Sequence, residues 1–156
     1  MAAQTGAALR YEPFEEESSF ARDVIAGLTA RPKRLPPKYF YDEIGAQLFE
    51  QITALPEYYP TRCELELLRE RAPDLARFFP AASALIEFGS GSSKKVRILL
   101  EAASTIAAYV PVDISSEMLV QEAEDLRRDY PHLAVLPVEA DFTRPFSLPA
   151  AVLSAS

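Results

Sequence analysis

The sequence is poor in residue types that mark several large classes of protein. Its 156 residues include one cysteine, one histidine, no tryptophan and five glycines. A single cysteine, Cys63, permits no disulfide within the chain, which is typical of the reducing cytoplasm, and we expect a cytoplasmic location. We expect Cys63 to pack as a small apolar residue. The single histidine, His132, has no second soft ligand near it, so we expect a loop position and no metal site.

Basic residues and long apolar runs are scarce as well. Lysine and arginine number 16 against 23 acidic residues, for a net charge of -7. Because nucleic-acid affinity depends on clustered basic residues, we expect no nucleic-acid partner. The densest basic run (Arg31, Lys33, Arg34 and Lys38) is broken by prolines, and we interpret it as a solvated segment. No apolar stretch approaches the roughly 20 residues of a membrane helix, and the start lacks the pattern of a secretory signal, so we expect no membrane partner.

The two halves of the chain differ in proline content and in predicted secondary structure. Residues 1–80 hold most of the thirteen prolines and predict helices separated by proline-marked breaks. The segment RPKRLPPK is excluded from a helix, because each proline restrains the residue before it. The predicted helices are 19–29, capped by Ser18 or Ser19; 41–55; a third capped by Thr61; and a short fourth that Pro73 opens and Phe79 ends.

From about residue 81 the pattern becomes strand, helix, strand, helix, strand. The apolar runs ALIEFG, AAYVPVD and LAVLPVEAD alternate with the helical segments KKVRILLEAAS and SSEMLVQEAEDLRRDY. This alternation predicts an α/β fold with a parallel sheet and crossover helices. Pro111 and Pro137 fall inside strand candidates, and we keep these strands because each proline lies near a carboxyl end.

Glycines and acids follow the three predicted strands at one rim of the sheet, where ligands of open parallel sheets bind. Gly89 and Gly91 let the backbone approach a ligand with no Cβ in the way. Asp113 ends the second strand, 24 residues after Gly89, and suits the hydroxyls of a ribose. Asp141 can accept from an exocyclic amine while Phe142 covers the base. Together these groups predict an adenosine-containing cofactor.

The glycine pattern separates the possible cofactors. A dinucleotide fold has a third glycine at position 94, where this chain has Lys94. A phosphate-binding P-loop has Gly-Lys-Ser/Thr after four intervening residues, and that is absent too. S-adenosylmethionine has no pyrophosphate and does not require the full glycine fingerprint, so it fits best.

Longer motifs point to one family. The segments PKYFYDEIGAQLFEQITALPEYYPTRCE, LIEFGSGSSKK, YVPVDIS and EADF resemble the S-adenosylmethionine-dependent L-histidine Nα-methyltransferases of ergothioneine biosynthesis, over residues 24–146. The resemblance implies a Rossmann-like class I methyltransferase fold, of which residues 81–156 hold the first three strands. It also implies that the helical region 1–80 contributes to the acceptor pocket, and that the reaction is methyl transfer to the α-amino group of histidine.

The resemblance assigns roles to individual residues. The cofactor contacts that it implies are Gly89, Lys95, Asp113, Asp141 and Phe142. The implied substrate contacts are Tyr58, the first tyrosine of EYYP, and Tyr41 and Phe49 from the preceding helix, for which ordinary core packing is the alternative. We expect Tyr59 to pack and Glu87 to shape the turn after its strand. No catalytic side chain is implied, because direct displacement at the methyl carbon uses no covalent nucleophile.

Members of this family are much longer than this chain, and FSLPAAVLSAS stands where a fourth strand is expected. We therefore expect an N-terminal portion, as a fragment or a natural truncation, that is inactive by itself and binds the cofactor weakly if at all. The apolar ALIEF strand would then present an open edge, through which copies can self-associate. Two other functions stay open: a non-catalytic cofactor-binding or interaction module, and a relative that methylates another amino-acid derivative.

Overall fold

The computed structural model describes residues 9–10, 16–148 and 150–153 of the chain. Its centre is a five-stranded sheet in which all paired strands run parallel, in the order β1-β5-β3-β2, with β4 also paired to β3. The strands are β1 (Leu9–Arg10), β2 (Ser83–Phe88), β3 (Ile106–Asp113), β4 (Ala134–Val135) and β5 (Val138–Glu139).

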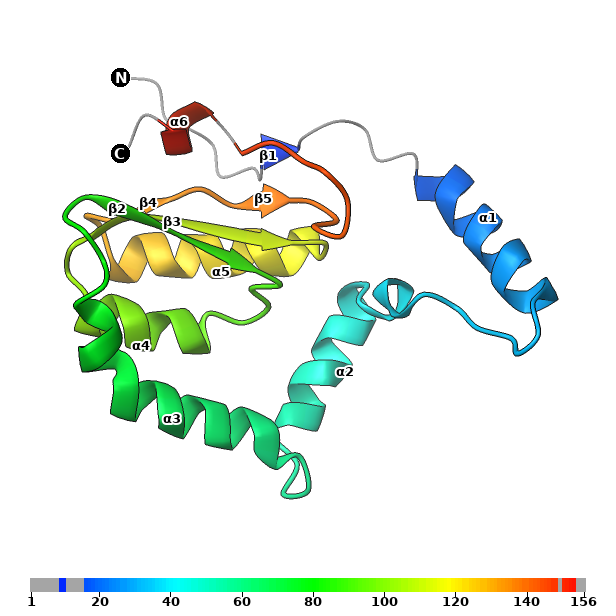
Figure 1. The fold of residues 1–156 in the computed structure, drawn as a ribbon, viewed down its shortest axis with the longest axis horizontal. Coiled ribbons are helices and arrows are strands. Elements are labelled where there is room, and N and C mark those ends of the chain that lie inside the picture. The colour runs from blue at the N-terminus through cyan, green and yellow to red at the C-terminus, as the bar shows by residue number, and fades with distance from the viewer. Residues whose placement is uncertain (1–8, 11–15, 149, 154–156) are drawn as a thin grey trace.

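Helices cover the sheet unevenly. In Figure 1, α4 and α5 lie along one face of the sheet and α3 packs on α4, whereas α1 and α2 reach away from the sheet. The helices are α1 (Glu16–Thr29), the 3-10 helix η1 (Pro37–Phe40), α2 (Glu43–Thr53), α3 (Tyr59–Ala76), α4 (Lys94–Ala102), α5 (Ser116–Asp129) and α6 (Ala150–Leu153).

The apolar core lies on both faces of β3. Tyr109 packs with Val96 of α4 and Leu126 of α5 on one face, while Val110 packs with Val152 of α6 on the other. Successive side chains of a strand point to opposite faces. A strand covered on both faces is apolar throughout, which explains the continuous run IAAYVPV.

The sheet confirms the predicted alternation and differs from it in detail. Pro111 lies inside β3, two residues before its end, as predicted. The third predicted strand is two short ones, β4 and β5. The N–H of Leu136 still donates to the carbonyl of Tyr109 on β3 at 2.9 Å, but Pro137 has no N–H to donate to a neighbouring strand. The short β1, which pairs with β5, was not predicted. The segment expected to begin a fourth strand contains α6 instead.

The N-terminal helices also correct the prediction. Ser18 and Ser19 both lie inside α1, so neither caps it. Residues 59–76 form one helix, so the predicted cap at Thr61 and the predicted break at Pro73 are both wrong. A proline is tolerated in the first turn, where Pro60 lies, since the N–H groups there have no helical partner. Pro73 lies in the last turn, where its missing N–H removes a single bond.

A connecting segment, residues 30–42, joins α1 to α2. RPKRLPPK is free of helix through Pro36, as predicted, but its last two residues open η1. Asp42 then caps α2, its carboxylate accepting from the N–H of Gly45 at 2.8 Å. A Cβ on Gly45 would collide with the carbonyl oxygen of Phe40. Glycine at this position therefore lets α2 start directly against η1.

The structure tests the expectations for Cys63, for His132 and for membrane-spanning helices. Cys63 is exposed, so the prediction that it packs in the core is wrong. His132 lies in an exposed turn, as predicted. Within the described residues, no helix is both long and apolar enough to cross a membrane; the cytoplasmic location stays a prediction. Among those residues β2 pairs only with β3, which leaves its outer edge open, and self-association through that edge stays a prediction.

Candidate functional site

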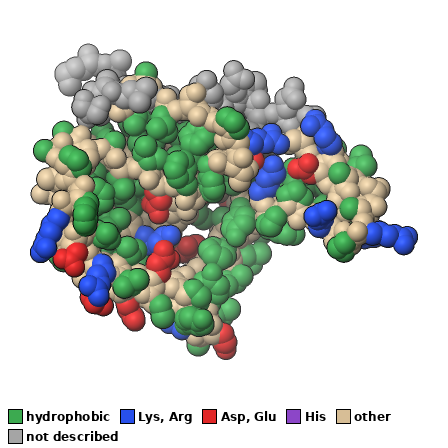
Figure 2. Space-filling view, viewed as in Figure 1, with side chains coloured by type: hydrophobic (Ala, Val, Ile, Leu, Met, Phe, Trp, Pro, Cys, Tyr) green, Lys and Arg blue, Asp and Glu red, His purple; other side chains and the backbone are tan. Residues whose placement is uncertain are grey.

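A pocket of about 510 Å³ opens between the carboxyl ends of the strands and the helices α2 and α3. Figure 2 shows the surface hollowed between the sheet and α2, with charged side chains in and around the hollow. All eight residues predicted to bind cofactor or substrate line this pocket: Gly89, Lys95, Asp113, Asp141, Phe142, Tyr58, Tyr41 and Phe49. The fold thus brings the predicted site residues together, while their individual roles stay predictions.

The loop after β2 presents backbone to the pocket. Gly89 and Gly91 have φ values of 68° and 49°, in the left-handed region that side chains other than glycine rarely adopt. The Gly89 N–H donates to the carbonyl of Val112 at 2.8 Å, which fixes the loop against β3. A Cβ on Gly89 would stand 3.6 Å from the ring of Phe142. Both glycines therefore serve the turn, while the close approach of a ligand to their backbone stays a prediction.

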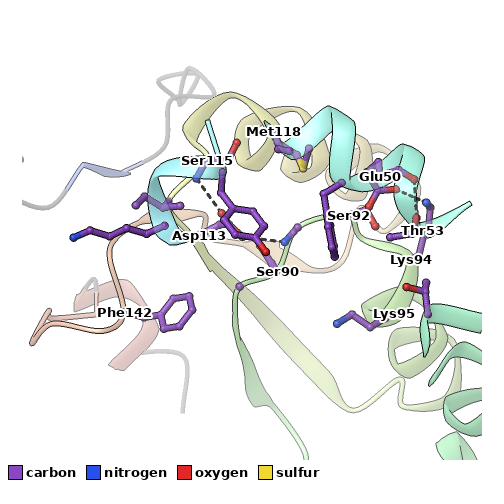
Figure 3. A pocket seen from close by; sticks show the side chains of 18 of the residues that line it. Glu50, Thr53, Ser90, Ser92, Lys94, Lys95, Asp113, Ser115, Met118 and Phe142 are labelled. Atoms are coloured by element: carbon purple, nitrogen blue, oxygen red, sulfur yellow. Dashed lines mark hydrogen bonds and ion pairs between the residues drawn. The ribbon is translucent and has the colours of Figure 1, made fainter. Parts of the chain in front are cut away.

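Asp113 holds two loops at the rim. One carboxylate oxygen accepts from the N–H of Gly91 at 3.0 Å and the other from the N–H of Ser115 at 2.9 Å. In Figure 3, Asp113 lies between Phe142 on one side and Lys94 and Lys95 on the other. A carboxylate offers about four lone-pair sites, so Asp113 keeps acceptor capacity for a ligand hydroxyl.

Asp141 is the most buried acid of the pocket, with 8% of its surface exposed. Its carboxylate accepts from the Thr143 N–H at 3.0 Å, from the Thr143 hydroxyl and from the Lys38 ammonium at 3.1 Å. Burial by itself would raise the pKa of Asp141, but these bonds outweigh it and the pKa is lowered. The Lys38 side chain is only 20% exposed, so the expectation of a solvated Lys38 is wrong.

Three aromatic side chains form the opposite wall. The ring of Phe49 lies 6.0 Å from Tyr41 and 6.0 Å from Tyr58, in edge-to-face arrangements. Tyr41 is 43% and Phe49 37% exposed, so neither is an ordinary core aromatic. Tyr59 is 65% exposed and does not line the pocket, so the expectation that it packs is wrong. All three side chains line the same pocket as the glycine loop.

Arg62 supports the loop that carries Tyr58, a role that sequence reasoning missed. Its guanidinium donates to the carbonyls of Leu55 at 2.8 Å, Pro56 at 2.5 Å and Tyr58 at 3.3 Å. The planar fork of arginine suits several carbonyls at once, unlike lysine. In the sequence, Arg62 is marked only by its place at the end of the string LPEYYPTR, which contributes to the family resemblance.

Ion pairs connect the start of α4 to the N-terminal helices. Lys94 pairs with Glu50 of α2 at 2.5 Å, and Lys95 pairs with Glu64 of α3 at 3.5 Å. All four residues line the pocket. The predicted cofactor contact Lys95 therefore already has one carboxylate partner, and its ammonium keeps further N–H donors for a ligand. Other lining residues that were not predicted include Ser90, Ser92, Ser115 and Met118.

Glu87 lies beneath the glycine loop rather than in the pocket lining. The hydroxyl of Tyr109 donates to its carboxylate at 2.6 Å. Burial raises the pKa of Glu87, and the Tyr109 bond offsets only part of this. Burial also raises the pKa of Tyr109, which therefore stays protonated and donating. The hydrogen bond ties Glu87 to β3, and its role in shaping the turn after β2 stays a prediction.

The pocket has carboxylate acceptors and the backbone of the glycine loop on the sheet side, and aromatic side chains on the side of α2 and the loop before α3. It suits a ligand with a ribose, a base and a charged amino-acid end, held against a second, aromatic ligand. Within the described residues, no group of three or more His, Cys, Asp or Glu side chains is placed to hold a metal ion.

Comparison with known proteins finds similarity to one group of methyltransferases. Residues 20–154 match the model of a family described as histidine-specific methyltransferase, SAM-dependent. The chain is 45% identical over 124 residues to a histidine N-alpha-methyltransferase of Mycobacterium tuberculosis, covering 78% of this chain and 38% of that protein. It is 44% identical over 91 residues to ergothioneine biosynthesis protein 1 of Neurospora crassa, covering 56% of this chain and 10% of that protein.

A third relative carries a different name. The chain is 34% identical over 113 residues to a 4-dimethylallyltryptophan N-methyltransferase of Claviceps purpurea, covering 70% of this chain and 33% of that protein. In each case this chain spans less than two fifths of the length of its relative.

Proposed function

The chain belongs to the family of SAM-dependent, histidine-specific methyltransferases, and from this premise we propose that it takes part in methyl transfer from S-adenosylmethionine to the α-amino group of L-histidine, in ergothioneine biosynthesis. The observation that carries the proposal is the pocket, where a rim suited to adenosine faces an aromatic wall. In this reading residues 81–156 supply the cofactor site and residues 1–80 supply one wall of the acceptor site.

The pocket residues fit the cofactor. The open backbone at Gly89 would lie against its methionine part, and Lys95 would contact the same end at the start of α4. Asp113 would accept from the ribose hydroxyls, and Asp141 and Phe142 would take the adenine. Phe142 is 46% exposed and free to cover a base. When bound, the cofactor would supply a methyl group on a sulfonium: the amine attacks the methyl carbon, the carbon–sulfur bond breaks, and S-adenosylhomocysteine leaves as the neutral thioether.

The protein's own contribution is to position the acceptor. Holding a neutral amine in line with the methyl carbon and excluding water accounts for a large part of the rate enhancement that such displacement needs. The Tyr58 hydroxyl would hydrogen-bond the amino acid, while Tyr41 and Phe49 offer faces to an aromatic side chain. Cys63 is exposed and does not line the pocket, which agrees with a reaction that has no covalent intermediate.

Cofactor binding is tested first, on residues 1–156 with S-adenosylhomocysteine, the product form. Ligand-observed NMR detects weak binding, which is what we expect of this chain. We expect saturation transfer to the adenine and ribose protons, reversed by S-adenosylmethionine and unaffected by NADH. No saturation transfer at millimolar ligand, either from this chain or from the folded chimaera described next, would contradict the proposal.

The acceptor role is tested in a chimaera in which this chain replaces the matching part of the Mycobacterium tuberculosis relative. Tyr58→Phe should raise the apparent KM for histidine while S-adenosylhomocysteine affinity stays unchanged, because only a substrate contact is lost. Tyr59→Phe is the matched control, since the neighbouring tyrosine lies outside the pocket lining. Equal kinetics for Tyr58→Phe and the parent would remove Tyr58 from the site.

The same chimaera separates the alternatives. A parent chimaera that binds S-adenosylhomocysteine but methylates no amino acid would favour the cofactor-binding module. The relative named for 4-dimethylallyltryptophan supports a second acceptor class. Initial rates with histidine and with tryptophan derivatives, measured side by side, decide between these acceptors.

A further inference from the structure

Three ion pairs cross the pocket from the N-terminal helices to the sheet side. They differ in burial: the Lys38 and Asp141 side chains are 20% and 5% exposed, against 56% and 31% for Lys94 and Glu50. The third pair, Lys95 with Glu64, is 36% and 53% exposed. Solvent and salt screen buried charges less than exposed ones. The Lys38–Asp141 contact is therefore the least screened of the three ion pairs.

The surroundings of Asp141 make Lys38 hard to replace. One carboxylate oxygen accepts from the N–H and hydroxyl of Thr143, and the other accepts from Lys38 at 3.1 Å. The second cation nearby, Arg144, stands 3.8 Å away with a side chain that is 55% exposed. Without Lys38 the second oxygen would keep no close charged donor, although a buried carboxylate depends on such partners.

Lys38 also belongs to a segment that is held on its other side. The hydroxyl of Tyr39 donates to Asp23 of α1 at 2.6 Å, and its ring packs edge-on against Phe20 at 4.9 Å. Tyr41, three residues after Lys38, begins the aromatic wall. The four-residue helix η1 thus carries the Lys38–Asp141 contact, and it also positions Tyr41, the first residue of the aromatic wall.

We propose that Lys38 is a positioning residue that fixes the Asp141 carboxylate and the η1 turn together, so that adenosine binding at the sheet rim and the placement of the aromatic wall are coupled. The inference rests on the proposed function, since it takes the adenosyl cofactor as the ligand beside Asp141. The recognition chemistry is a carboxylate that accepts from an exocyclic amine, with its orientation set by the ammonium. Loss of the ammonium removes one of the three hydrogen bonds that hold the carboxylate, and it removes the polar link between the η1 turn and the sheet rim.

The first test measures S-adenosylhomocysteine affinity in Lys38→Met, Asp141→Asn and the double variant. We expect Lys38→Met to weaken binding about tenfold or more, and to add less than about twofold once Asp141→Asn is present. Lys38→Arg, which keeps a charged donor, should recover part of the affinity. The matched control is Lys33→Met, because Lys33 is an exposed lysine of the same segment, and it should bind like the parent.

The second test follows η1 itself. The chain has no tryptophan, so Phe40→Trp introduces a single indole on η1, at a side chain that is 64% exposed and outside the pocket lining. Saturating S-adenosylhomocysteine should change its emission. In Phe40→Trp with Lys38→Met, the emission should stay constant at ligand concentrations that saturate the site.

The outcomes separate this inference from the proposed function. A parent that binds no S-adenosylhomocysteine, both as this chain and within the chimaera, overturns both. A parent that binds, with Lys38→Met equal to Lys33→Met, overturns only the role of Lys38. An undiminished Lys38→Met effect in the Asp141→Asn background shows that Lys38 does not act through Asp141, and ligand-dependent emission without Lys38 overturns the coupling. Circular dichroism checks each fold, and Lys38→Gln replaces Lys38→Met if the latter unfolds.

Discussion

The sheet region and the N-terminal helices are held by different forces. The largest fully buried side chains all lie on β3, β5, α4 and α5: Tyr109, Leu119, Leu126, Val96, Val110, Val112 and Val138. In α2, by contrast, Ala46 is the one residue that is buried, while Ile44 is 67% and Leu48 53% exposed. Figure 2 shows hydrophobic side chains at the surface on the α2 side of the hollow.

This difference indicates how each region responds to change. Apolar burial stabilises the sheet region, at roughly 25 cal/mol per Å² of surface removed from water. The connecting segment 30–42 and α2 contact the rest of the molecule through a few polar interactions, among them Lys38–Asp141, Lys94–Glu50 and Tyr39–Asp23. Substitutions in the first region should therefore change stability, and substitutions in the second should change the pocket.

The largest effect is expected in the core. Leu126→Ala should lower the free energy of unfolding by about 2–5 kcal/mol, because it leaves a cavity beside Tyr109 and Val96. The matched substitution Ile44→Ala, at a side chain that is 67% exposed, should stay within about 0.5 kcal/mol. Urea unfolding followed by circular dichroism measures both. Comparable losses would show that α2 is packed as tightly as the sheet.

The next effect concerns the rim. Asp113→Ala should weaken S-adenosylhomocysteine binding by roughly 1.5–3 kcal/mol, the usual contribution of charged hydrogen bonds. It also removes the acceptor for the Gly91 and Ser115 N–H groups, which loosens the glycine loop. Asp125→Ala, on α5 and outside the pocket lining, is the control. Calorimetry showing unchanged affinity in folded Asp113→Ala would remove Asp113 from the site.

A smaller effect is expected at the turn before α3. Arg62→Lys keeps the charge but cannot reach three carbonyls at once, so Tyr58 should lose its fixed position. We expect the KM for histidine in the chimaera to rise about fivefold, or about 1 kcal/mol, with S-adenosylhomocysteine affinity unchanged. Arg69→Lys, an exposed arginine of the same helix, is the control. A parallel loss of cofactor affinity would contradict this division of roles between the two walls.

The smallest effect is a dependence of stability on pH. Burial raises the pKa of Glu87 above 4.5, so the protonated form favours the folded state. The stability that it contributes is complete below pH 4.5 and is lost as the pH rises through the folded-state pKa. The free energy of unfolding of the parent should therefore fall over this range relative to Glu87→Gln. Glu66→Gln, at an exposed acid, should follow the parent curve; parallel curves for parent and Glu87→Gln would contradict the prediction.

Local sequence pattern determined the framework of the site. Apolar runs and their period located β2 and β3, and the glycines and acids after them marked the rim, because the carboxyl ends of parallel strands meet at one edge. The predicted cofactor residues Gly89, Asp113 and Asp141 all line the pocket as a result. The predicted substrate residues depended on the resemblance of the YFYD and LPEYYPTR strings, because the spacing of apolar residues does not distinguish a pocket aromatic from a core aromatic.

Tertiary structure alone decided which side chains meet. Lys38 and Asp141 stand 103 positions apart in the sequence, and only the path of the chain turns an apparently solvated lysine into the partner of a buried carboxylate. Arg62 is a local case, because its three carbonyl partners lie four to seven positions before it and depend on the geometry of one turn. Helix and strand propensities are local and weak, so the sequence pattern predicted breaks at Thr61 and Pro73 that α3 does not have. An ammonium has no periodicity, and the partner of Lys38 is fixed only when distant segments fold against each other.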